Sequence, residues 1–259
     1  MMTLGHIKKI PKVQNYLDRA DEVMASIGFT EHGRRHANVV SKRARSVLEA
    51  LERPQRQCEL AAIAAYLHDI GNIVNREYHA QSGSVLAHHL LLSVEMPVEE
   101  VIEVVTAIGH HHETDGAPVS DIAAALIVAD KSDVHRSRVR NKSMIDLDIH
   151  DRVNYAVTHS SLKVIGPRAA KQMEGEREAN GREDPSAQEP AVTVVSGDRH
   201  VGHAGGEKPS LTLSLTIDVS IAPVMEYFEI FLPRMILSNR AAAHLGAVYK
   251  LVINDTHLL

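Results

Sequence analysis

The sequence predicts an α+β protein, in which an all-α helical bundle is followed by a small C-terminal β-sheet with one covering helix. Up to about residue 150, apolar residues recur at the spacing of amphipathic or buried helices. Over 166–210 the composition changes to Gly, Pro and mixed charges, and from residue 211 apolar and polar residues alternate strictly. We therefore expect two domains in the 259 residues, at 1–150 and 151–259.

Four segments of the first domain have the pattern of helices. In the segment 34–51 an apolar residue stands at every third or fourth position, which makes one apolar stripe. The segments 57–67 and 122–129 are apolar nearly all round, and we expect them to be buried. The fourth segment follows Pro97, a residue that suits a helix start. Its predicted buried side consists of Val98, Val101, Ile102, Val105 and Ile108.

The second domain is expected to contain a small sheet and one helix. Residues 211–219 alternate without a fault, which predicts a half-buried strand. A helix is predicted over 223–245, kinked at Pro233 and stopped at Gly246. A further strand is predicted at 247–253.

The chain between these two parts changes character at residue 166. We predict a strand over 152–165 and a flexible insertion over 166–210, which is rich in Gly and Pro. Whether 191–195 forms a strand inside this insertion is open at the level of sequence.

Composition and charge argue against several classes of protein. Lys and Arg number 28 against 33 Asp and Glu, so the formal charge of -5 gives no general attraction to a nucleic-acid backbone. Aromatic residues make up 3% of the chain, which argues against a base-stacking platform. The single cysteine, Cys58, excludes an intrachain disulfide, and the longest apolar run is far shorter than the roughly 18 residues of a membrane span. We expect a cytoplasmic protein with neither a membrane nor a long nucleic acid among its partners.

Histidine and aspartate residues stand where the predicted helices face the core. His68 and Asp69 follow a buried segment, and burying a carboxylate beside an imidazole is costly unless a partner such as a divalent cation pairs them. His36 lies on the apolar stripe of its helix, and Asp130 directly follows the last buried segment. Each of these side chains therefore needs a polar partner in the core.

Two further histidine positions have the same character. On a helix that continues from Pro97 at about 100° per residue, His112 falls in line with the apolar stripe, His111 lies at its edge and His110 points almost the opposite way. His79 begins a helical stretch and shares its face with apolar residues. Taken singly, each histidine is explained as a core residue satisfied by a hydrogen bond. Taken together, they are explained by one shared metal centre.

The order of these residues resembles the signature of a known family. His36, then the pair His68 and Asp69 in HDIGN, then Asp130 in IVADKSD are similar to the signature of the HD-domain superfamily of metal-dependent phosphohydrolases. The resemblance covers about residues 30–140. It implies a helical HD domain that binds divalent metal ions.

Additional histidines resemble those of the superfamily branches that bind two metal ions. His79 in HAQSG and the pair in HHETDG are similar to the extra ligands of the HD-GYP branch, which cleaves cyclic dinucleotides. The chain departs from that branch, because it reads GAPVS where the branch continues toward Gly-Tyr-Pro and has Asn72 where a Lys is usual. We therefore do not expect cyclic di-GMP to be the substrate.

The resemblance implies a binuclear centre in which Asp69 bridges two ions and, with His68, forms its catalytic core. A hydroxide shared between such ions attacks phosphorus in line. The mixed imidazole and carboxylate donors favour Mn, Fe, Co, Ni or Zn over Mg. Beside the bridging Asp69, the predicted ligands are His36, His68 and Asp130 for the first ion and His79, His111 and His112 for the second.

The predicted function is hydrolysis of a phosphomonoester or phosphodiester, with a nucleotide as the expected substrate. After Asp130, basic residues gather in KSDVHRSRVR, and we expect Lys131, Arg136 and Arg138 to bind the substrate phosphate, although a solvated helix end explains them equally well. Two alternatives stay open, a di-iron oxygenase of the same superfamily and a non-catalytic nucleotide sensor. The C-terminal part is expected to serve ligand sensing or the formation of a homodimer.

Overall fold

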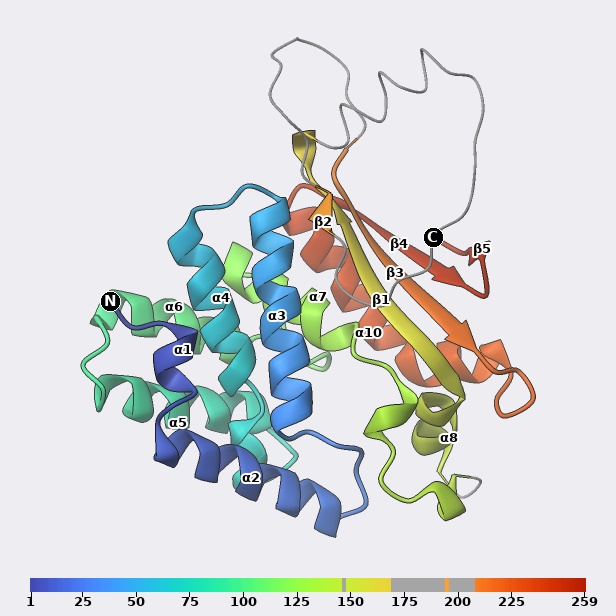
Figure 1. The fold of residues 1–259 in the computed structure, drawn as a ribbon, viewed down its shortest axis with the longest axis horizontal. Helices are drawn as coiled ribbons and strands as arrows, with labels where there is room; N and C mark the ends of the chain where they lie inside the picture. The colour runs from blue at the N-terminus through green and yellow to red at the C-terminus, as the bar shows by residue number, and fades with distance from the viewer. Residues whose placement is uncertain (146–147, 169–193, 196–207) are drawn as a thin grey trace.

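The computed structural model describes residues 1–145, 148–168, 194–195 and 208–259 (Figure 1). A bundle of helices comes first in the chain, and a five-stranded sheet with the long helix α10 follows, so the predicted α+β class is confirmed. The helices are α1 (Leu4–Ile7), α2 (Pro11–Ser26), α3 (Arg34–Ala50), α4 (Gln55–Leu67), η1 (Ile70–Ile73), α5 (His79–Leu92), α6 (Val98–Gly109), α7 (Asp121–Lys131), η2 (Arg136–Arg138), η3 (Lys142–Met144), α8 (Ile149–Ala156) and α10 (Val224–His244). The strands are β1 (Val157–Ile165), β2 (Val194–Val195), β3 (Ser210–Ile217), β4 (Val248–Ile253) and β5 (Thr256–His257).

Helix α7 connects the bundle to the C-terminal part. All of its residues from Ile122 to Lys131 are buried, as the apolar run predicts. It packs against α3, α4 and α6 and also against α10 (Figure 1). Residues at the end of α7 can therefore meet side chains from both parts of the chain.

Helix α6 ends earlier than the sequence predicts, at Gly109. Its buried residues are Val101, Val104, Ala107 and Ile108. Val98 and Ile102, predicted on the buried side, are 49% and 54% exposed. The prediction is wrong at these two positions because α6 packs against both α4 and α5, which turns its Val104 and Ala107 side inward.

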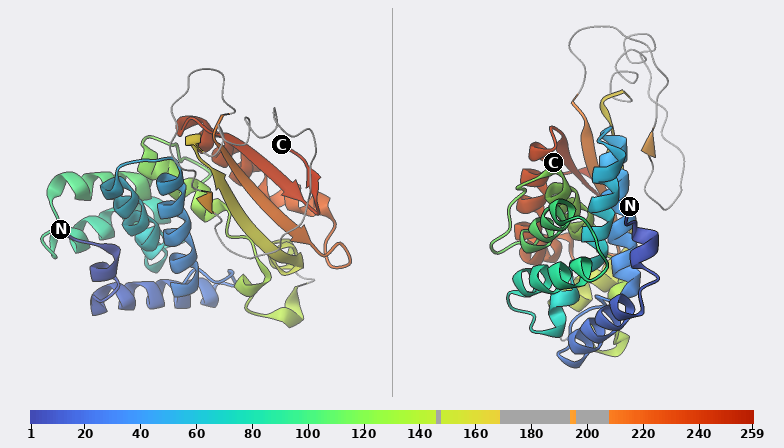
Figure 2. Two further views of the ribbon diagram at one scale, coloured as in Figure 1. Left: turned by 45° about the horizontal axis from the view of Figure 1, so that its top comes forward. Right: turned by 90° about the vertical axis from the view of Figure 1, so that its left-hand side faces the viewer.

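The strands form one sheet in the order β2-β1-β3-β4-β5. β1 is antiparallel to β3, whereas β3 and β4 are parallel because α10 crosses from the end of one to the start of the other. Helix α10 covers one face of this sheet and contacts α7 on its other side (Figure 2). The predicted strand 211–219 ends at Ile217, because Asp218 accepts hydrogen bonds from the backbone and hydroxyl of Ser220 and turns the chain. Val219 is consequently exposed.

The strand predicted over 152–165 is correct only in its second part. Residues Ile149–Ala156 form α8, and Val157–Ile165 form β1. Asp148 starts the helix, because its carboxylate accepts hydrogen bonds from the backbone N–H groups two and three residues later. The prediction of a strand at the start of this range is therefore wrong, since the cap favours a helix that the short apolar pattern does not indicate.

Helix α10 agrees with the range predicted from the sequence. It runs through Pro233 without a break and is followed by Gly246, whose φ of 77° is the left-handed conformation that favours glycine after a helix. Its buried aromatic and methionine side chains are Tyr227, Phe231 and Met235. These side chains pack in the core, as expected for this apolar stripe.

Several expectations fall partly outside the described residues. Most of the predicted insertion 166–210 does so, but Val194–Val195 form β2, which pairs in parallel with β1.

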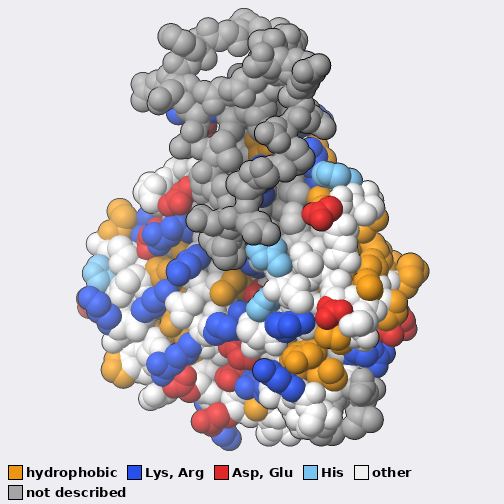
Figure 3. Space-filling model, turned by 45° about the vertical axis from the view of Figure 1, so that its right-hand side comes forward, with side chains coloured by type: hydrophobic (Ala, Val, Ile, Leu, Met, Phe, Trp, Pro, Cys, Tyr) orange, Lys and Arg blue, Asp and Glu red, His pale blue; other side chains and the backbone are white. Residues whose placement is uncertain are grey.

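None of the described helices combines the length and the hydrophobicity needed to cross a membrane. On the face drawn in Figure 3, basic and acidic side chains are interspersed. The absence of nucleic-acid partners and the division into domains 1–150 and 151–259 stay predictions.

Candidate metal centre

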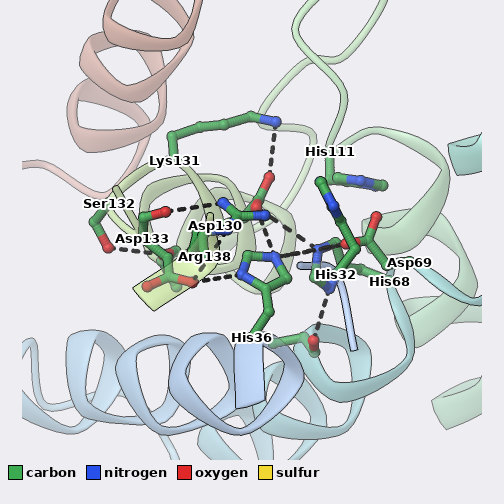
Figure 4. A network of polar contacts seen from close by, with 12 residues as sticks. His32, His36, His68, Asp69, His111, Asp130, Lys131, Ser132, Asp133 and Arg138 are labelled. Atoms are coloured by element: carbon green, nitrogen blue, oxygen red, sulfur yellow. Dashed lines mark hydrogen bonds and ion pairs between the residues drawn. The ribbon is translucent and has the colours of Figure 1, made fainter. Parts of the chain in front are cut away.

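Four buried side chains converge where α3, α4 and α7 pack together (Figure 4). His36 lies in the first turn of α3, His68 and Asp69 directly follow α4, and Asp130 is the penultimate residue of α7. Each of the four residues is at most 5% exposed. The three helices thus bring together residues that are far apart in the sequence.

The first group of ligand atoms comes from His36, His68 and Asp130. The Nε2 atoms of His36 and His68 lie 3.3 Å apart, and Asp130 Oδ1 lies 3.3 Å from the former and 3.7 Å from the latter. Two nitrogens bound to one ion at about 2.1 Å are about 3.0 to 3.4 Å apart at octahedral or tetrahedral angles. The spacing of these atoms therefore fits a shared metal ion.

The second group comes from His68, Asp69 and His111, with His79 beside it. The Nε2 atoms of His79 and His111 lie 3.2 Å apart. Asp69 Oδ2 lies 3.2 Å from His68 Nε2 and 3.5 Å from His36 Nε2. The other oxygen, Oδ1, lies 3.6 Å from His79 Nε2. The two oxygens of Asp69 thus face two different sets of imidazoles.

Three of the imidazole rings are fixed by the backbone. Nδ1 of His68, His79 and His111 donates to the carbonyl oxygen three residues earlier, at 2.8, 2.9 and 2.7 Å. Because a carbonyl oxygen only accepts, Nδ1 carries a hydrogen, and in the neutral form of each ring Nε2 is the atom that can bind a cation. A metal-ligating histidine is commonly held in this way. Nε2 of His79 also lies 3.4 Å from Arg76 Nη1.

His36 is held by a carboxylate instead of the backbone. Its Nδ1 lies 2.6 Å from Asp133 Oδ2, which also accepts a hydrogen bond from Arg35 Nη2 at 2.9 Å. The buried Arg138 lies 3.9 Å from the same oxygen. Asp133 is absent from the sequence prediction, although its position three residues after Asp130 in ADKSD was a usable signal. It orients a candidate ligand without belonging to either group of ligand atoms.

The centre contains a buried acceptor that has no hydrogen-bond donor. Asp69 Oδ2 accepts no hydrogen bond within the described part of the chain, although two Nε2 atoms face it. Burial alone would lower the pKa of His68, but the carboxylates of Asp69 and Asp130 outweigh burial and raise it to about 10. In the metal-free protein a proton on His68 therefore supplies the positive charge that the carboxylates require. This orphaned oxygen and the mixed donor set fit a divalent metal ion.

The imidazoles of His79 and His111 are uncharged at neutral pH. Burial, assisted by the positive charge of Arg76, lowers the pKa of His79 to about 4. Burial and the neighbouring His68 hold the pKa of His111 well below its ordinary value. Both rings are therefore in the neutral form that binds a metal ion.

A cavity of about 330 Å³ opens beside the centre, with Asp69, His79 and His111 in its wall. Other parts of the wall come from distant segments. Phe29 follows α2, whereas Phe231 and Arg234 belong to α10. The C-terminal helix thus contributes to the same cavity as the candidate metal ligands.

Lys131 is one of the predicted phosphate-binding residues that line this cavity. Its Nζ lies 2.5 Å from Glu113 Oε2 and 2.7 Å from Asp130 Oδ2. Since two carboxylates already share the ammonium group, Lys131 neutralises the acidic side of the centre. Its contact with a substrate stays a prediction.

The other two predicted phosphate-binding residues have their side chains engaged elsewhere. Arg138 lines the cavity, but its guanidinium donates to the backbone carbonyls of Glu31 and Asp133. Arg136 lies over the ring of Tyr155, with Cζ 5.1 Å from the centroid, and is not among the residues that line the cavity in the described part of the chain. A role for either residue in substrate binding also stays a prediction.

His112 lines the cavity but stands apart from both groups of ligand atoms. Its ring centroid lies 4.9 Å from that of His79, and its side chain is 26% exposed. Its Nδ1 accepts a hydrogen bond from the backbone N–H of Thr114 at 3.5 Å, so the hydrogen of the neutral ring lies on Nε2. This tautomer is the reverse of that in the other candidate ligands, and the assignment of His112 as a ligand stays a prediction.

The cavity wall also contains polar side chains that the sequence prediction does not include, among them His32, Arg76 and Arg234. His32 precedes α3, and its Nδ1 lies 2.6 Å from the carbonyl oxygen of Thr30, which leaves Nε2 without the hydrogen. Arg76 lies over the ring of Phe29, with Cζ 5.5 Å from the centroid. His32 and Arg76 stand outside the apolar stripes, and Arg234 follows Pro233 in a helix read as a packing element, so hydrophobic periodicity does not identify them.

The match to one family model agrees with the motif. The family model of the HD domain matches residues 30–147, a range that includes every predicted metal ligand. An uncharacterised protein from Methanocaldococcus jannaschii is 29% identical in an alignment 163 residues long, which covers 54% of this chain and 62% of that protein. The match thus spans about three fifths of the length of this curated relative. A crystal structure of a predicted HD superfamily hydrolase from an uncultured Thermotogales bacterium is 25% identical, with a TM-score of 0.39, and the match covers 56% of this chain and 80% of that one.

Proposed function

We propose that the protein is a metal-dependent phosphohydrolase that cleaves a phosphomonoester or phosphodiester of a nucleotide, because the family model of the HD domain matches residues 30–147. The observation that carries the proposal is the position of Asp69, whose two oxygens face different sets of imidazoles. A carboxylate in this position is suited to bridge two ions. Pairs of divalent ions are a common device for hydrolysing phosphate esters.

The described residues fit two ions. His36, His68, Asp130 and Asp69 Oδ2 would hold the first, and His79, His111 and Asp69 Oδ1 would hold the second, with His112 as its further predicted ligand. The donor set favours Mn, Fe, Co, Ni or Zn. Such ions, when bound, lower the pKa of a shared water toward neutrality and neutralise phosphoryl oxygens.

The side chains around the ligands support the same reaction. Asp133 and the backbone carbonyls fix the imidazole rings, and Lys131 balances the charge of Asp130 and Glu113. Phe29 and Phe231 line the cavity, and aromatic side chains can contact a nucleobase. The volume of about 330 Å³ is near the lower end of small-molecule sites, which favours a mononucleotide over a cyclic dinucleotide.

The test compares the wild-type protein with Asp69→Asn, which keeps the shape of the side chain and removes its charge. We expect the wild type, loaded with Mn²⁺ or Co²⁺, to hydrolyse p-nitrophenyl phosphate or bis-p-nitrophenyl phosphate. The variant should bind fewer ions by elemental analysis and lose about 100-fold or more of the activity. His110→Ala is the matched control, because His110 does not belong to either group of ligand atoms. An Asp69→Asn protein with unchanged metal content and activity would show the proposal to be wrong.

The same preparation separates the alternative functions. A di-iron oxygenase consumes oxygen and needs a redox-active iron pair, whereas a hydrolase works with Mn²⁺ or Co²⁺ and leaves the oxygen concentration unchanged. A nucleotide sensor binds nucleotides and hydrolyses none of them. A cytoplasmic location and a homodimer formed through the C-terminal part remain further proposals.

A further inference from the structure

Helix α10 lies outside the matched HD domain, yet it places an arginine beside the candidate metal centre. We propose that Arg234 binds the phosphoryl group of the substrate, an inference that rests on the proposed function. The active site is then complete only with the C-terminal part. This assigns to α10 a role in catalysis in place of the ligand sensing or dimer formation expected from the sequence.

Arg234 is directed at the oxygens of the centre. Its Nη2 lies 3.9 Å from Asp130 Oδ1, the oxygen that is also 3.3 Å from His36 Nε2. Its Nε lies 3.6 Å from Glu113 Oε1. Because the guanidinium of Arg234 lies this close to the first group of ligand atoms, it can also reach a phosphoryl oxygen that is bound there. The guanidinium is thus placed to contact the reacting group.

Within the part of the chain that the structure describes, Arg234 donates no hydrogen bond. Both carboxylate distances exceed hydrogen-bonding length, and Nε is buried without an acceptor among the residues that the structure describes. Only 15% of the side chain is exposed. A buried guanidinium with unused N–H donors is costly unless acceptors arrive from a ligand.

The two neighbouring carboxylates do not by themselves require Arg234. Glu113 Oε2 and Asp130 Oδ2 already accept short contacts from Lys131 Nζ, at 2.5 and 2.7 Å. A phosphoryl group has three oxygens that accept hydrogen bonds, and the planar guanidinium can donate to two of them at once. Of the other basic residues that line the cavity, Arg138 has its donors bound to backbone carbonyls, and Arg76 Nη1 donates to Asn72 Oδ1 at 3.3 Å. Arg234 is therefore the better candidate.

Neighbouring groups hold the guanidinium in place. Cζ of Arg234 lies 5.0 Å from the centroid of the Phe231 ring, which supports it by a cation–π contact. Phe231 is itself buried, and α10 packs against α7, the helix that carries Asp130. The guanidinium therefore needs little reorganisation when a phosphoryl group enters.

The experiment measures binding of orthophosphate to the metal-loaded protein by isothermal titration calorimetry, alongside kcat and KM for an aryl phosphate. We compare the wild type with Arg234→Met and Arg234→Lys, and use Arg240→Met, an exposed position of the same helix, as the matched control. Loss of charged hydrogen bonds predicts about 10- to 150-fold weaker phosphate binding in Arg234→Met, with metal content unchanged. Arg234→Lys, which keeps the charge and loses the planar fork, should lose less.

Chemical rescue distinguishes binding from a structural role. Arg234→Ala leaves space for a free guanidinium ion, so added guanidinium at millimolar concentration should restore part of its activity and leave the wild type unaffected. If the Met variant fails to fold, the Lys and Ala variants carry the test. Orthophosphate affinity within twofold of the wild type in the folded variants, with no rescue, overturns the role of Arg234 alone. A wild type that neither binds orthophosphate nor hydrolyses any phosphate ester overturns the proposed function as well.

Discussion

Replacing Asp133 by Asn tests whether a carboxylate outside the ligand set prepares His36 for a metal ion. Asp133 Oδ2 lies 2.6 Å from His36 Nδ1 and 2.9 Å from Arg35 Nη2, and its side chain is 3% exposed. Asn has nearly the same volume, so the substitution removes charge without opening a cavity. Its amide offers one oxygen and one NH₂ group, whereas His36 and Arg35 both need an acceptor.

The magnitude follows from the two contacts. A hydrogen bond to a charged group contributes about 1 to 1.5 kcal/mol more than a neutral one, so weakening both contacts costs about 2 to 3 kcal/mol of folding free energy. Removal of the hydrogen-bond partner that orients a metal-binding histidine typically weakens metal binding about 10- to 100-fold. We expect both effects, with the first visible as a lower melting temperature of the metal-free protein.

Metal affinity is measured by competition with a chelator, and stability by urea unfolding of the metal-free protein. The control is Asp18→Asn, because Asp18 forms an exposed pair with Arg34, and exposed pairs contribute at most about 1 kcal/mol. An Asp133→Asn protein with wild-type metal affinity would refute the reasoning. It would mean that the packing of α3 alone orients His36.

Three other predictions concern the centre and its support. His111→Ala should lower the metal content by about one ion per chain, whereas its neighbour His110, which is absent from both groups of ligand atoms, can be changed to Ala without that loss; equal metal content in the two variants would contradict the second group. Gly71→Ala should destabilise the protein by about 3 kcal/mol or more in urea unfolding, because the added Cβ would lie 1.9 Å from the carbonyl oxygen of His79. The control Gly5→Ala should have little effect, because the nearest atom to its added Cβ lies 3.6 Å away. Equal stability of these two variants would contradict the packing. Because the folded pKa of His68 is raised to about 10 from 6.5, its stabilisation of the metal-free protein is full below pH 6.5 and is lost as the pH rises through 10. Metal binding at pH 7 should therefore release a proton, seen as a calorimetric enthalpy that depends on the ionisation enthalpy of the buffer, and an enthalpy that is the same in every buffer would contradict this.

Residues that combine a polar side chain with an apolar helical pattern could be predicted from the sequence. His36 on its stripe and Asp130 at the end of a buried run lie in the centre, because the same periodicity that forms the helices also sets the direction of these side chains. His111 rather than His110 was also predicted, although the reason differs in the structure. Helix α6 ends at Gly109, and His111 is fixed by a hydrogen bond from Nδ1 to the carbonyl oxygen of Ile108.

Features that depend on tertiary contacts could not be predicted in this way. Arg234 stands in a helix whose apolar pattern indicates packing, and only the contact between α10 and α7 brings it to Asp130. Arg138 belongs to a basic run that suggested phosphate binding, yet its donors satisfy backbone carbonyls. The start of α8 depends on the cap at Asp148, a single local hydrogen-bonding group that competes with the weak strand pattern of the following residues.

The hydrogen bonds from Nδ1 of His68, His79 and His111 to main-chain carbonyls have a consequence for metal exchange. These hydrogen bonds involve no ion, so we expect the rings to keep their orientation when the metal ions are removed from the folded chain. Folding and metallation are then separate equilibria, unlike those of a zinc finger, which folds only around its metal. Different metal ions can thus be added in turn to the metal-free protein on the same backbone. Differences in kcat among these preparations then reflect the identity of the metal ion.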